Sequence, residues 1–105
     1  MVLEDAIKKL DTESEKYKLG GILEEWKDQI IEMAASDEAI RDGIEKHTIA
    51  EVLGKALKEG FDGKIVVHED IIKAAGLKPD KSRPIYIGVP TRARIKKIIR
   101  EVYIS

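Results

Sequence analysis

The chain has 105 residues, a length typical of one domain with a single core, and its 43% hydrophobic and 37% charged residues exclude a disordered chain. The absence of cysteine excludes disulfides, thiolate nucleophiles and cysteine-ligated metal centres, while a net charge of −1 excludes a uniformly basic protein. No apolar run approaches the roughly 20 residues that span a bilayer, and acidic residues follow Met1 where a secretory signal would be basic. We therefore expect a cytoplasmic protein, and its usage of Lys, Glu and Ile resembles that of thermophilic proteins.

The first 20 residues predict helix with one uncertain interruption. Apolar residues form a single stripe over 2–10, and a polar stretch then follows at 11–15. Thr12 and Glu15 have the spacing of a capping box, which predicts a second short helix that ends at Gly20-Gly21. The alternative is one helix over 2–18 with a polar middle.

Two further helices are predicted before residue 47. The segment 22–35 places its apolar residues on one face, with Trp26 as the largest of them. Ser36 is predicted to cap the next helix, over 37–46, whose first turn is acidic as the helix dipole favours.

The clearest helix of the sequence is predicted over 48–59. Thr48 and Glu51 form a capping box, and the apolar residues that follow recur at helical spacing. Gly60 is predicted to supply the left-handed residue that ends this helix, with Phe61 folding back onto the last turn.

The remainder alternates short strands with helices. Strands are predicted over 64–67 and 85–89, and residues 102–104 are compatible with a third. A two-turn helix over 69–75, with Ile71, Ile72 and Ala75 inward, ends at Gly76. A last helix over 91–101 begins at Pro90 or at Thr91, the alternative cap, and buries a row of isoleucines.

These elements predict an α+β protein that is mainly helical and forms a single domain over 1–105. Residues 1–47 form an acidic helical portion with a charge balance of −6, and residues 48–105 form a basic portion with a balance of +5. The second portion has a winged-helix-like order of elements with a small sheet of two or three strands. It departs from a helix-turn-helix because at least thirteen residues separate the helices over 69–75 and 91–101.

A basic helix is the leading candidate for a functional site. Its bases lie opposite the isoleucines, and guanidinium groups are suited to phosphate. Bases of the preceding loop, Lys78 among them, are predicted to extend this patch as a wing does beside DNA. The candidate nucleic-acid-binding residues are Arg92, Arg94, Lys96, Lys97, Arg100, Arg83 and Lys81. The expected function is therefore that of a small non-enzymatic nucleic-acid-binding or regulatory protein, with duplex DNA favoured because no aromatic residues for stacking lie beside the bases.

The alternative is that the basic helix is a solvated face whose charges pair with the acidic portion of the chain. In that case the protein is a helical adaptor or assembly module without affinity for nucleic acid, and the basic helix contacts an acidic protein partner. The apolar stripes over 2–10 and 22–34 pair with each other or form a homodimer interface, and Ile31 is a candidate contact. The simpler expectation for Ile31 is packing against the helix over 37–46.

Other chemistries lack a motif in this sequence. His68-Glu69-Asp70 is the one cluster that resembles a metal or acid–base site, but adjacent residues at a helix start point in different directions. His68 and His47 are therefore expected to serve the starts of helices. The serines lie in no nucleophile turn and the glycines form no phosphate loop. We expect no catalytic residue, no metal site and no cofactor.

Overall fold

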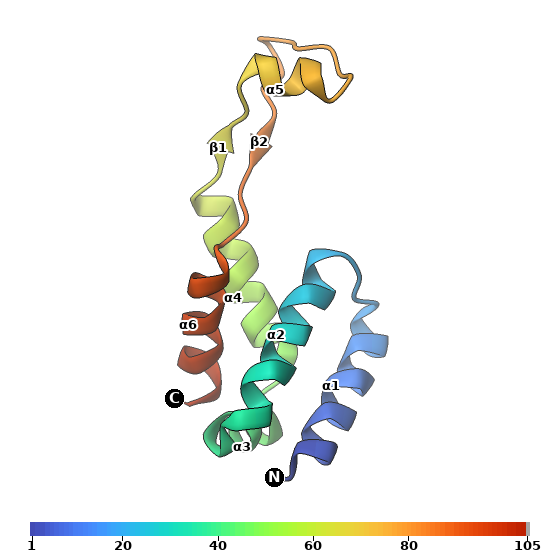
Figure 1. Cartoon of the computed structure of the whole chain (residues 1–105), viewed down its shortest axis with the longest axis vertical. Helices are drawn as coiled ribbons and strands as arrows, with labels where there is room; N and C mark the ends of the chain where they lie inside the picture. Colours follow the sequence, from blue (N-terminus) through green and yellow to red (C-terminus); the bar gives the residue numbers. More distant parts are fainter. Residues whose placement is uncertain (105) are drawn as a thin grey trace.

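The computed structural model describes residues 1–104 and is mainly helical, with helix over 68% of the chain. Within that range it contains six helices and one small antiparallel sheet of two strands. The molecule is elongated, with extents of 51 × 24 × 19 Å and a radius of gyration of 16.6 Å, against about 13 Å for a compact domain of 100 residues. Figure 1 shows the reason: most of the helices form a body, from which residues 63–90 project as an arm.

The body contains the only large core among the described residues. It consists of α1 (Leu3–Tyr17), α2 (Ile22–Ser36), α3 (Glu38–Lys46), α4 (Ile49–Asp62) and α6 (Arg92–Tyr103). Each of these helices gives one apolar face to a shared cluster, in which Trp26, Leu10 and the isoleucines of α6 are buried. The acidic and basic portions of the sequence therefore meet in one core. The apolar stripes over 2–10 and 22–34 pack largely within the chain, although Val2 and Ile22 at their starts stay exposed.

The N-terminal helix is continuous, so the single-helix alternative is confirmed and the interruption at Thr12 is wrong. The polar residues in the middle of this helix are compatible with its packing because Glu13 accepts a buried hydrogen bond from the Ile49 amide. Thr12 stays exposed, and its hydroxyl donates to the carbonyl of Lys8 at 3.0 Å. The left-handed residue that ends the helix is Lys18, with φ of 53°. The chain then turns through Gly20-Gly21 into α2 as predicted.

The start of α3 and the end of α4 each lie after the predicted position. The N-cap of α3 is Asp37 in place of Ser36, because the Asp37 carboxylate accepts from the Ala39 amide at 3.0 Å. Helix α4 begins at its predicted capping box, where the Thr48 amide donates to Glu51 at 2.7 Å. It then continues through Gly60 to Asp62.

Gly60 has a different role from the predicted one. An added Cβ at Gly60 would lie 2.5 Å from the carbonyl oxygen of Gly88, and one at Gly88 would lie 1.9 Å from the oxygen of Gly60. The two backbones are therefore in direct contact, and this contact holds the returning end of the arm against α4. Phe61 does not fold back on the helix and is 65% exposed.

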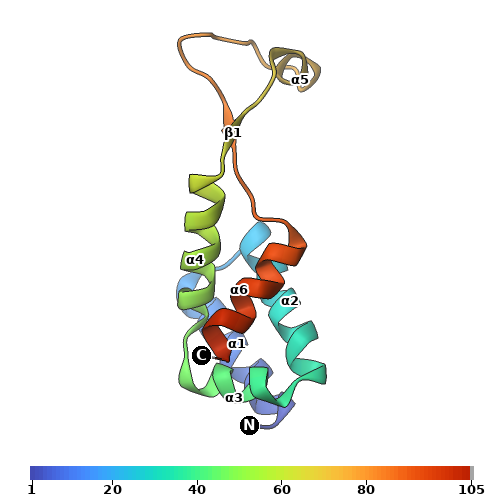
Figure 2. The ribbon, with the colours of Figure 1, turned by 90° about the vertical axis from the view of Figure 1, so that its left-hand side faces the viewer.

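The arm is a narrow ribbon with a small helix at its tip, as Figures 1 and 2 show from two directions. Strand β1 (Ile65–Val66) pairs with β2 (Tyr86–Ile87), which makes Ile65 face Ile87 and Val66 face Tyr86. Helix α5 (Glu69–Ala74) lies between the strands in sequence and ends before Gly76, which has φ of 81°. Both strands are shorter than predicted. The residues considered for a third strand belong largely to the end of α6.

The tip of the arm has almost no core of its own. Of the three residues predicted to point inward from α5, only Ile72 is buried, whereas Ile71 is 62% exposed and Ala75 is also exposed. The prediction for Ile71 and Ala75 is wrong because no neighbouring layer covers that side of α5. His68 caps α5 as expected, since its Nδ1 accepts from the Asp70 amide at 3.1 Å.

Candidate functional site

The predicted basic residues fall into two separate groups. Arg92, Arg94, Lys96, Lys97 and Arg100 all lie on α6, in the body of the molecule. Lys78, Lys81 and Arg83 lie in the loop after α5, at the far end of the arm (Figure 1). The ribbon separates the two groups, so the loop does not extend the patch on α6.

The three arginines of α6 are paired with carboxylates. Arg92 contacts Glu32 of α2 at 2.6 Å, and Arg100 reaches Asp37 at 3.5 Å. Arg94 forms a two-pronged pair with Glu59 of α4, in which its Nε donates at 3.0 Å. Two of these pairs join the basic portion to the acidic portion, as the alternative interpretation of the sequence predicts. A phosphate group would have to displace these carboxylates.

The predicted bases that lack a carboxylate partner among the described residues lie both on α6 and on the loop after α5. Among residues 1–104, no ion pair involves Lys96, Lys97, Lys78, Lys81 or Arg83. Lys96 does line a shallow hollow between α6 and α2, in the same row as Arg92 and Arg100. That hollow also contains the carboxylates of Glu32 and Asp37, so its charge is mixed.

The Arg94–Glu59 ion pair shifts the pKa values of both side chains. The Arg94 guanidinium holds the pKa of the Glu59 carboxyl below its ordinary value, and the carboxylate in turn raises the pKa of Arg94. The pair lies at the foot of the arm, beside a hollow that contains Gly60, Gly63 and Pro90. It therefore reinforces the contact between the start of α6 and the end of α4.

The surface that most sets this molecule apart is apolar and lies on the arm. Side chains directly opposite each other in a ribbon share a face, and successive side chains alternate between faces. Ile65 and Ile87 therefore occupy one face, and Val66 and Tyr86 occupy the other. All four are exposed, at 51% to 66%. Neither face of the ribbon is polar, and neither is covered by another part of the described chain.

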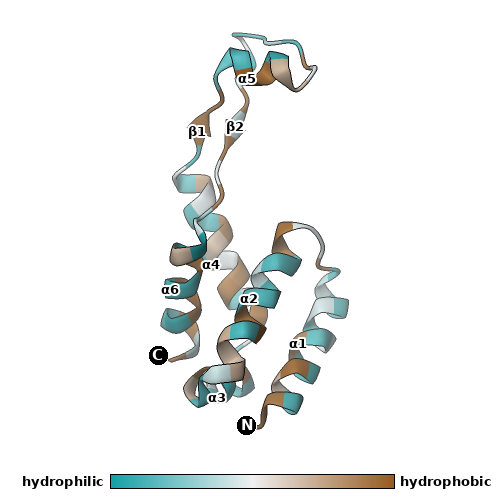
Figure 3. Cartoon of the chain, in the orientation of Figure 1, coloured by the Kyte–Doolittle hydropathy of each residue, from teal (hydrophilic) through white to brown (hydrophobic). Residues whose placement is uncertain are grey.

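The apolar residues continue from the ribbon in both directions. Figure 3 shows brown segments on the ribbon and on α5 at the tip. We define the arm surface as the ten large apolar residues of the arm and of the adjoining turn of α4 that are at least 40% exposed. They are Leu57, Phe61, Ile65, Val66, Ile71, Leu77, Ile85, Tyr86, Ile87 and Val89.

The foot of the arm carries a cation among these apolar groups. The Lys64 ammonium lies 3.6 Å from the centre of the Phe61 ring and 5.7 Å from that of Tyr86. Its positive charge is attracted to the faces of aromatic rings. The lysine therefore lies over one face of the Phe61 ring, while both aromatic side chains stay largely exposed.

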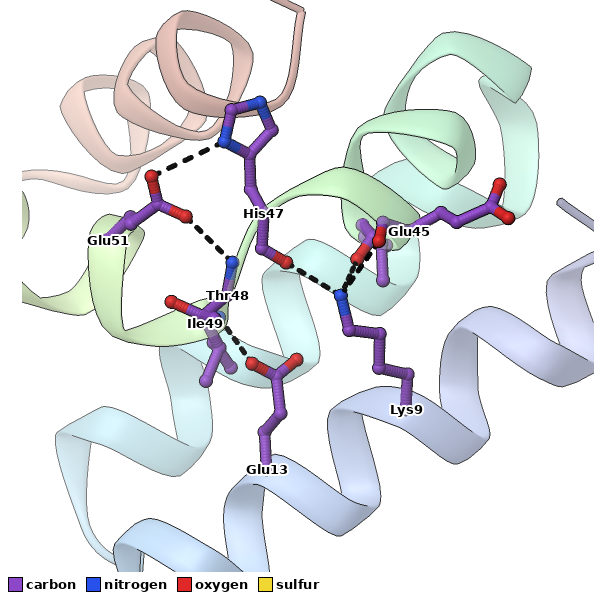
Figure 4. A network of polar contacts seen from close by, with 8 residues as sticks. Lys9, Glu13, Glu45, His47, Thr48, Ile49 and Glu51 are labelled. Atoms are coloured by element: carbon purple, nitrogen blue, oxygen red, sulfur yellow. Dashed lines mark hydrogen bonds and ion pairs between the residues drawn. The ribbon is translucent and has the colours of Figure 1, made fainter.

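A network of polar contacts joins α1 to the end of α3 and the start of α4, and it was not predicted from the sequence. Lys9 of α1 donates to the carbonyls of Ile44 and His47 at the end of α3 (Figure 4). Glu13, one turn further along α1, accepts from the Ile49 amide at 2.8 Å. The signal was Glu13 itself, an acid on the helical face shared by Ala6 and Leu10. Helix α1 thus places the Lys9 ammonium at the C-terminal end of α3 and the Glu13 carboxylate at the N-terminal end of α4, where the helix dipoles favour these charges.

The two histidines make local contacts at the starts of helices. His47 contacts Glu51 at 3.3 Å as part of the α3–α4 turn. Burial and the nearby carboxylate of Glu13 raise the pKa of the Tyr103 hydroxyl far above its ordinary value, so it stays protonated. Residues 1–104 contain no cluster of three potential metal ligands, and no helix in this range is long and apolar enough to cross a membrane.

Comparisons with protein-family models, with curated proteins and with solved structures found no match to this chain.

Proposed function

We propose that this protein is an assembly module that binds another protein through its arm. The observation that carries the proposal is that both faces of the β1–β2 ribbon are apolar and exposed. A two-stranded ribbon alone in water is marginally stable at best. A partner that covers these faces would both stabilise the ribbon and remove its apolar surface from water.

The extent of the arm surface supports the same proposal. The ten side chains of the arm surface are each 40% to 66% exposed. They lie on both faces of the ribbon and on the tip, so no single flat patch contains all of them. Exposed apolar side chains that gather in this way mark sites of interaction between proteins. A partner that wraps around the arm would cover both faces.

The arrangement of charge favours a protein over phosphate. The three arginines of α6 are engaged by carboxylates, and the ribbon itself carries apolar side chains where a nucleic-acid-binding arm would carry bases. Interfaces between proteins are enriched in aromatic residues at their centre and depleted in charge there. Phe61 and Tyr86 are the exposed aromatic residues of this surface.

Site-specific photo-crosslinking tests the proposal. A photoreactive amino acid replaces Ile87 on the ribbon, and a control carries the same amino acid in place of Ile104, an exposed apolar residue at the end of α6. In cells of the source organism, irradiation is expected to give a protein adduct from position 87 and none from position 104. Absence of any protein adduct at position 87, or adducts with nucleic acid alone, would contradict the assembly function.

Nucleic-acid binding is the second candidate, favoured by the five bases of α6 and of the loop at the tip that make no ion pair among the described residues. The winged-helix-like order of elements stays a prediction and belongs to this candidate, in which α6 and the loop at the tip contact the backbone of duplex DNA. Fluorescence anisotropy at about 50 and 200 mM salt tests it, because release of counterions makes phosphate binding steeply salt-dependent. Alanine at Lys96 and Lys97 is expected to abolish binding. No binding at the lower salt concentration would exclude this candidate.

A further inference from the structure

The proposed function leaves the partner open, and the arm surface contains information about it. We propose that the partner is a second copy of this chain, with the two arms antiparallel. The tip of each arm then lies on the other copy, beside the foot of its arm and the start of its α2. This inference rests on the assembly function and adds to it the identity and orientation of the partner.

The first argument is that one face of the ribbon can pack on a copy of itself across a twofold axis. In a twofold interface the same patch is used by both copies, so an apolar face must be able to pack on itself. The Ile65–Ile87 face is aliphatic, with a shallow hollow formed by Ile65, Ile87 and Val89. Such a face can take the same aliphatic side chains from another ribbon, without a buried charge or an unpaired polar side chain.

The second argument concerns where the tip would land. When two arms overlap antiparallel, the tip of one reaches the foot of the other. At the foot, the start of α2 lies against the end of the arm, because Ile22, Glu25, Pro90 and Arg92 line one small hollow. Ile22 is 41% exposed there. It provides an apolar contact for the exposed Ile71 and Leu77 of the arriving tip.

The third argument is charge complementarity between the tip and this landing site. The loop at the tip carries the exposed bases Lys81 and Arg83, which make no ion pair among the described residues. The outer face of α2 carries the exposed acids Glu25 and Asp28, which likewise have none within residues 1–104. The two groups cannot meet within one chain, because the ribbon holds them apart (Figures 1 and 2). In an antiparallel dimer the bases of each tip lie beside the acids of the other copy, which gives two such contacts.

The oligomeric state tests the partner. Analytical ultracentrifugation of the full chain over a wide concentration range is expected to give a species of twice 11.8 kDa. Ile87→Lys buries a charge in the centre of the proposed interface and is expected to weaken the dimer at least about tenfold. Ile104→Lys, the same change on an exposed apolar residue away from the arm, is expected to leave it unchanged. Circular dichroism should show the same helix content for all three proteins.

A charge exchange tests the orientation. One variant carries Lys81→Glu and Arg83→Glu, and the other carries Glu25→Lys and Asp28→Lys. Each variant alone places like charges together at both contacts and is expected to dimerise more weakly than the wild type. An equimolar mixture places opposite charges together at both contacts. The mixture is therefore expected to recover the wild-type dimer as a heterodimer.

Three outcomes would overturn the inference. A wild-type chain that stays monomeric at every concentration excludes a second copy as the partner, while the crosslink at position 87 still decides the assembly function separately. A dimer that Ile87→Lys does not weaken has its interface elsewhere. A dimer that is sensitive to Ile87→Lys but shows no recovery in the charge-exchange mixture excludes the antiparallel orientation.

Discussion

At the scale of single residues, the buried carboxylate of Glu13 is the most informative side chain of the body. It is only 8% exposed, and one of its oxygens accepts from the amide of Ile49 at the start of α4. The other oxygen is buried without a hydrogen-bond partner among the described residues. A buried charge of this kind is retained at a cost in solvation, so its contact with the helix N-terminus must offset that cost.

Replacement of Glu13 is therefore expected to destabilise the protein. Glu13→Ala leaves the Ile49 amide buried without its acceptor, which should lower the free energy of unfolding by about 1–3 kcal/mol. The exposed neighbour Glu15 provides the control, because Glu15→Ala should change stability by no more than about 0.5 kcal/mol. Urea unfolding followed by circular dichroism measures both. Equal losses for the two variants would show that the buried contact contributes nothing specific.

The Glu59 carboxyl gives a prediction that depends on pH. Its pKa is lowered chiefly by its hydrogen bond with Arg94. A carboxyl with a lowered pKa in the folded state stabilises the fold above the pKa that it has in the unfolded chain, and this contribution is lost as the pH falls through the folded value. Arg94→Gln should therefore raise the Glu59 pKa toward its ordinary value. The free energy of unfolding of this variant should then fall less as the pH is lowered. Carbon-detected NMR titration of Glu59 measures the shift, with Arg92→Gln as a control that leaves it in place.

At the scale of elements, the attachment of the arm depends on a contact between two backbones. Gly60 lies inside α4, where alanine is ordinarily better than glycine by about 1 kcal/mol. At this position an added Cβ would collide with the Gly88 carbonyl oxygen at 2.5 Å, and backbone cannot move aside as a flexible side chain can. The steric cost should therefore exceed the gain in helix propensity.

Two alanine substitutions in the same helix test this directly. Gly60→Ala should destabilise the protein or detach the ribbon from α4, whereas Gly54→Ala should stabilise it by up to about 1 kcal/mol, because nothing lies within 4 Å of an added Cβ there. Thermal unfolding measures stability, and NMR shifts of β2 report on the ribbon. The prediction is wrong if both substitutions stabilise the protein by the same amount.

The elements also show which features were predictable from the sequence. The capping box at Thr48 and the isoleucine face of α6 depend on local spacing, and both were predicted correctly. Gly60 was assigned to the end of a helix because its local sequence fits that role. Its true neighbour, Gly88, is 28 residues away in the chain, and local spacing contains no information on that contact.

The candidate site shows the same limit. The bases of α6 lie on the exposed side of the helix, opposite the buried isoleucines, as predicted. The carboxylates that pair with Arg92 and Arg100 come from α2 and the cap of α3. The apolar alternation over 85–89 correctly predicted a strand. Alternation cannot tell whether a strand is covered, so the exposure of both faces of the ribbon could be learned only from the arrangement of the helices.

At the scale of the whole molecule, the body is expected to fold without the arm. None of the residues in the main core cluster comes from residues 63–90. The two ends of the arm meet at the Gly60–Gly88 contact, so a short turn can replace what lies between them. Replacement of residues 64–88 by a tight Asn-Gly turn should keep the cooperative unfolding of the body, because it removes none of the side chains of the main core cluster.

Circular dichroism during heating measures this outcome. The shortened chain should lose only the helical signal of α5 and should unfold in a single transition. Loss of cooperative unfolding would show that the arm contributes to the folding of the body, against the separation described above. The same shortened chain should be monomeric in ultracentrifugation, since it lacks most of the arm surface.

The Gly60–Gly88 contact has a consequence for how this sequence can diverge. Neither position tolerates a side chain while the other stays in place, so the two glycines are constrained as a pair by the arm and by nothing else in the body. A descendant that keeps the arm is expected to keep both glycines, however far the rest of its surface drifts. A descendant that loses the arm is released from both constraints at once, and alanine should then replace Gly60 readily because it favours the helix.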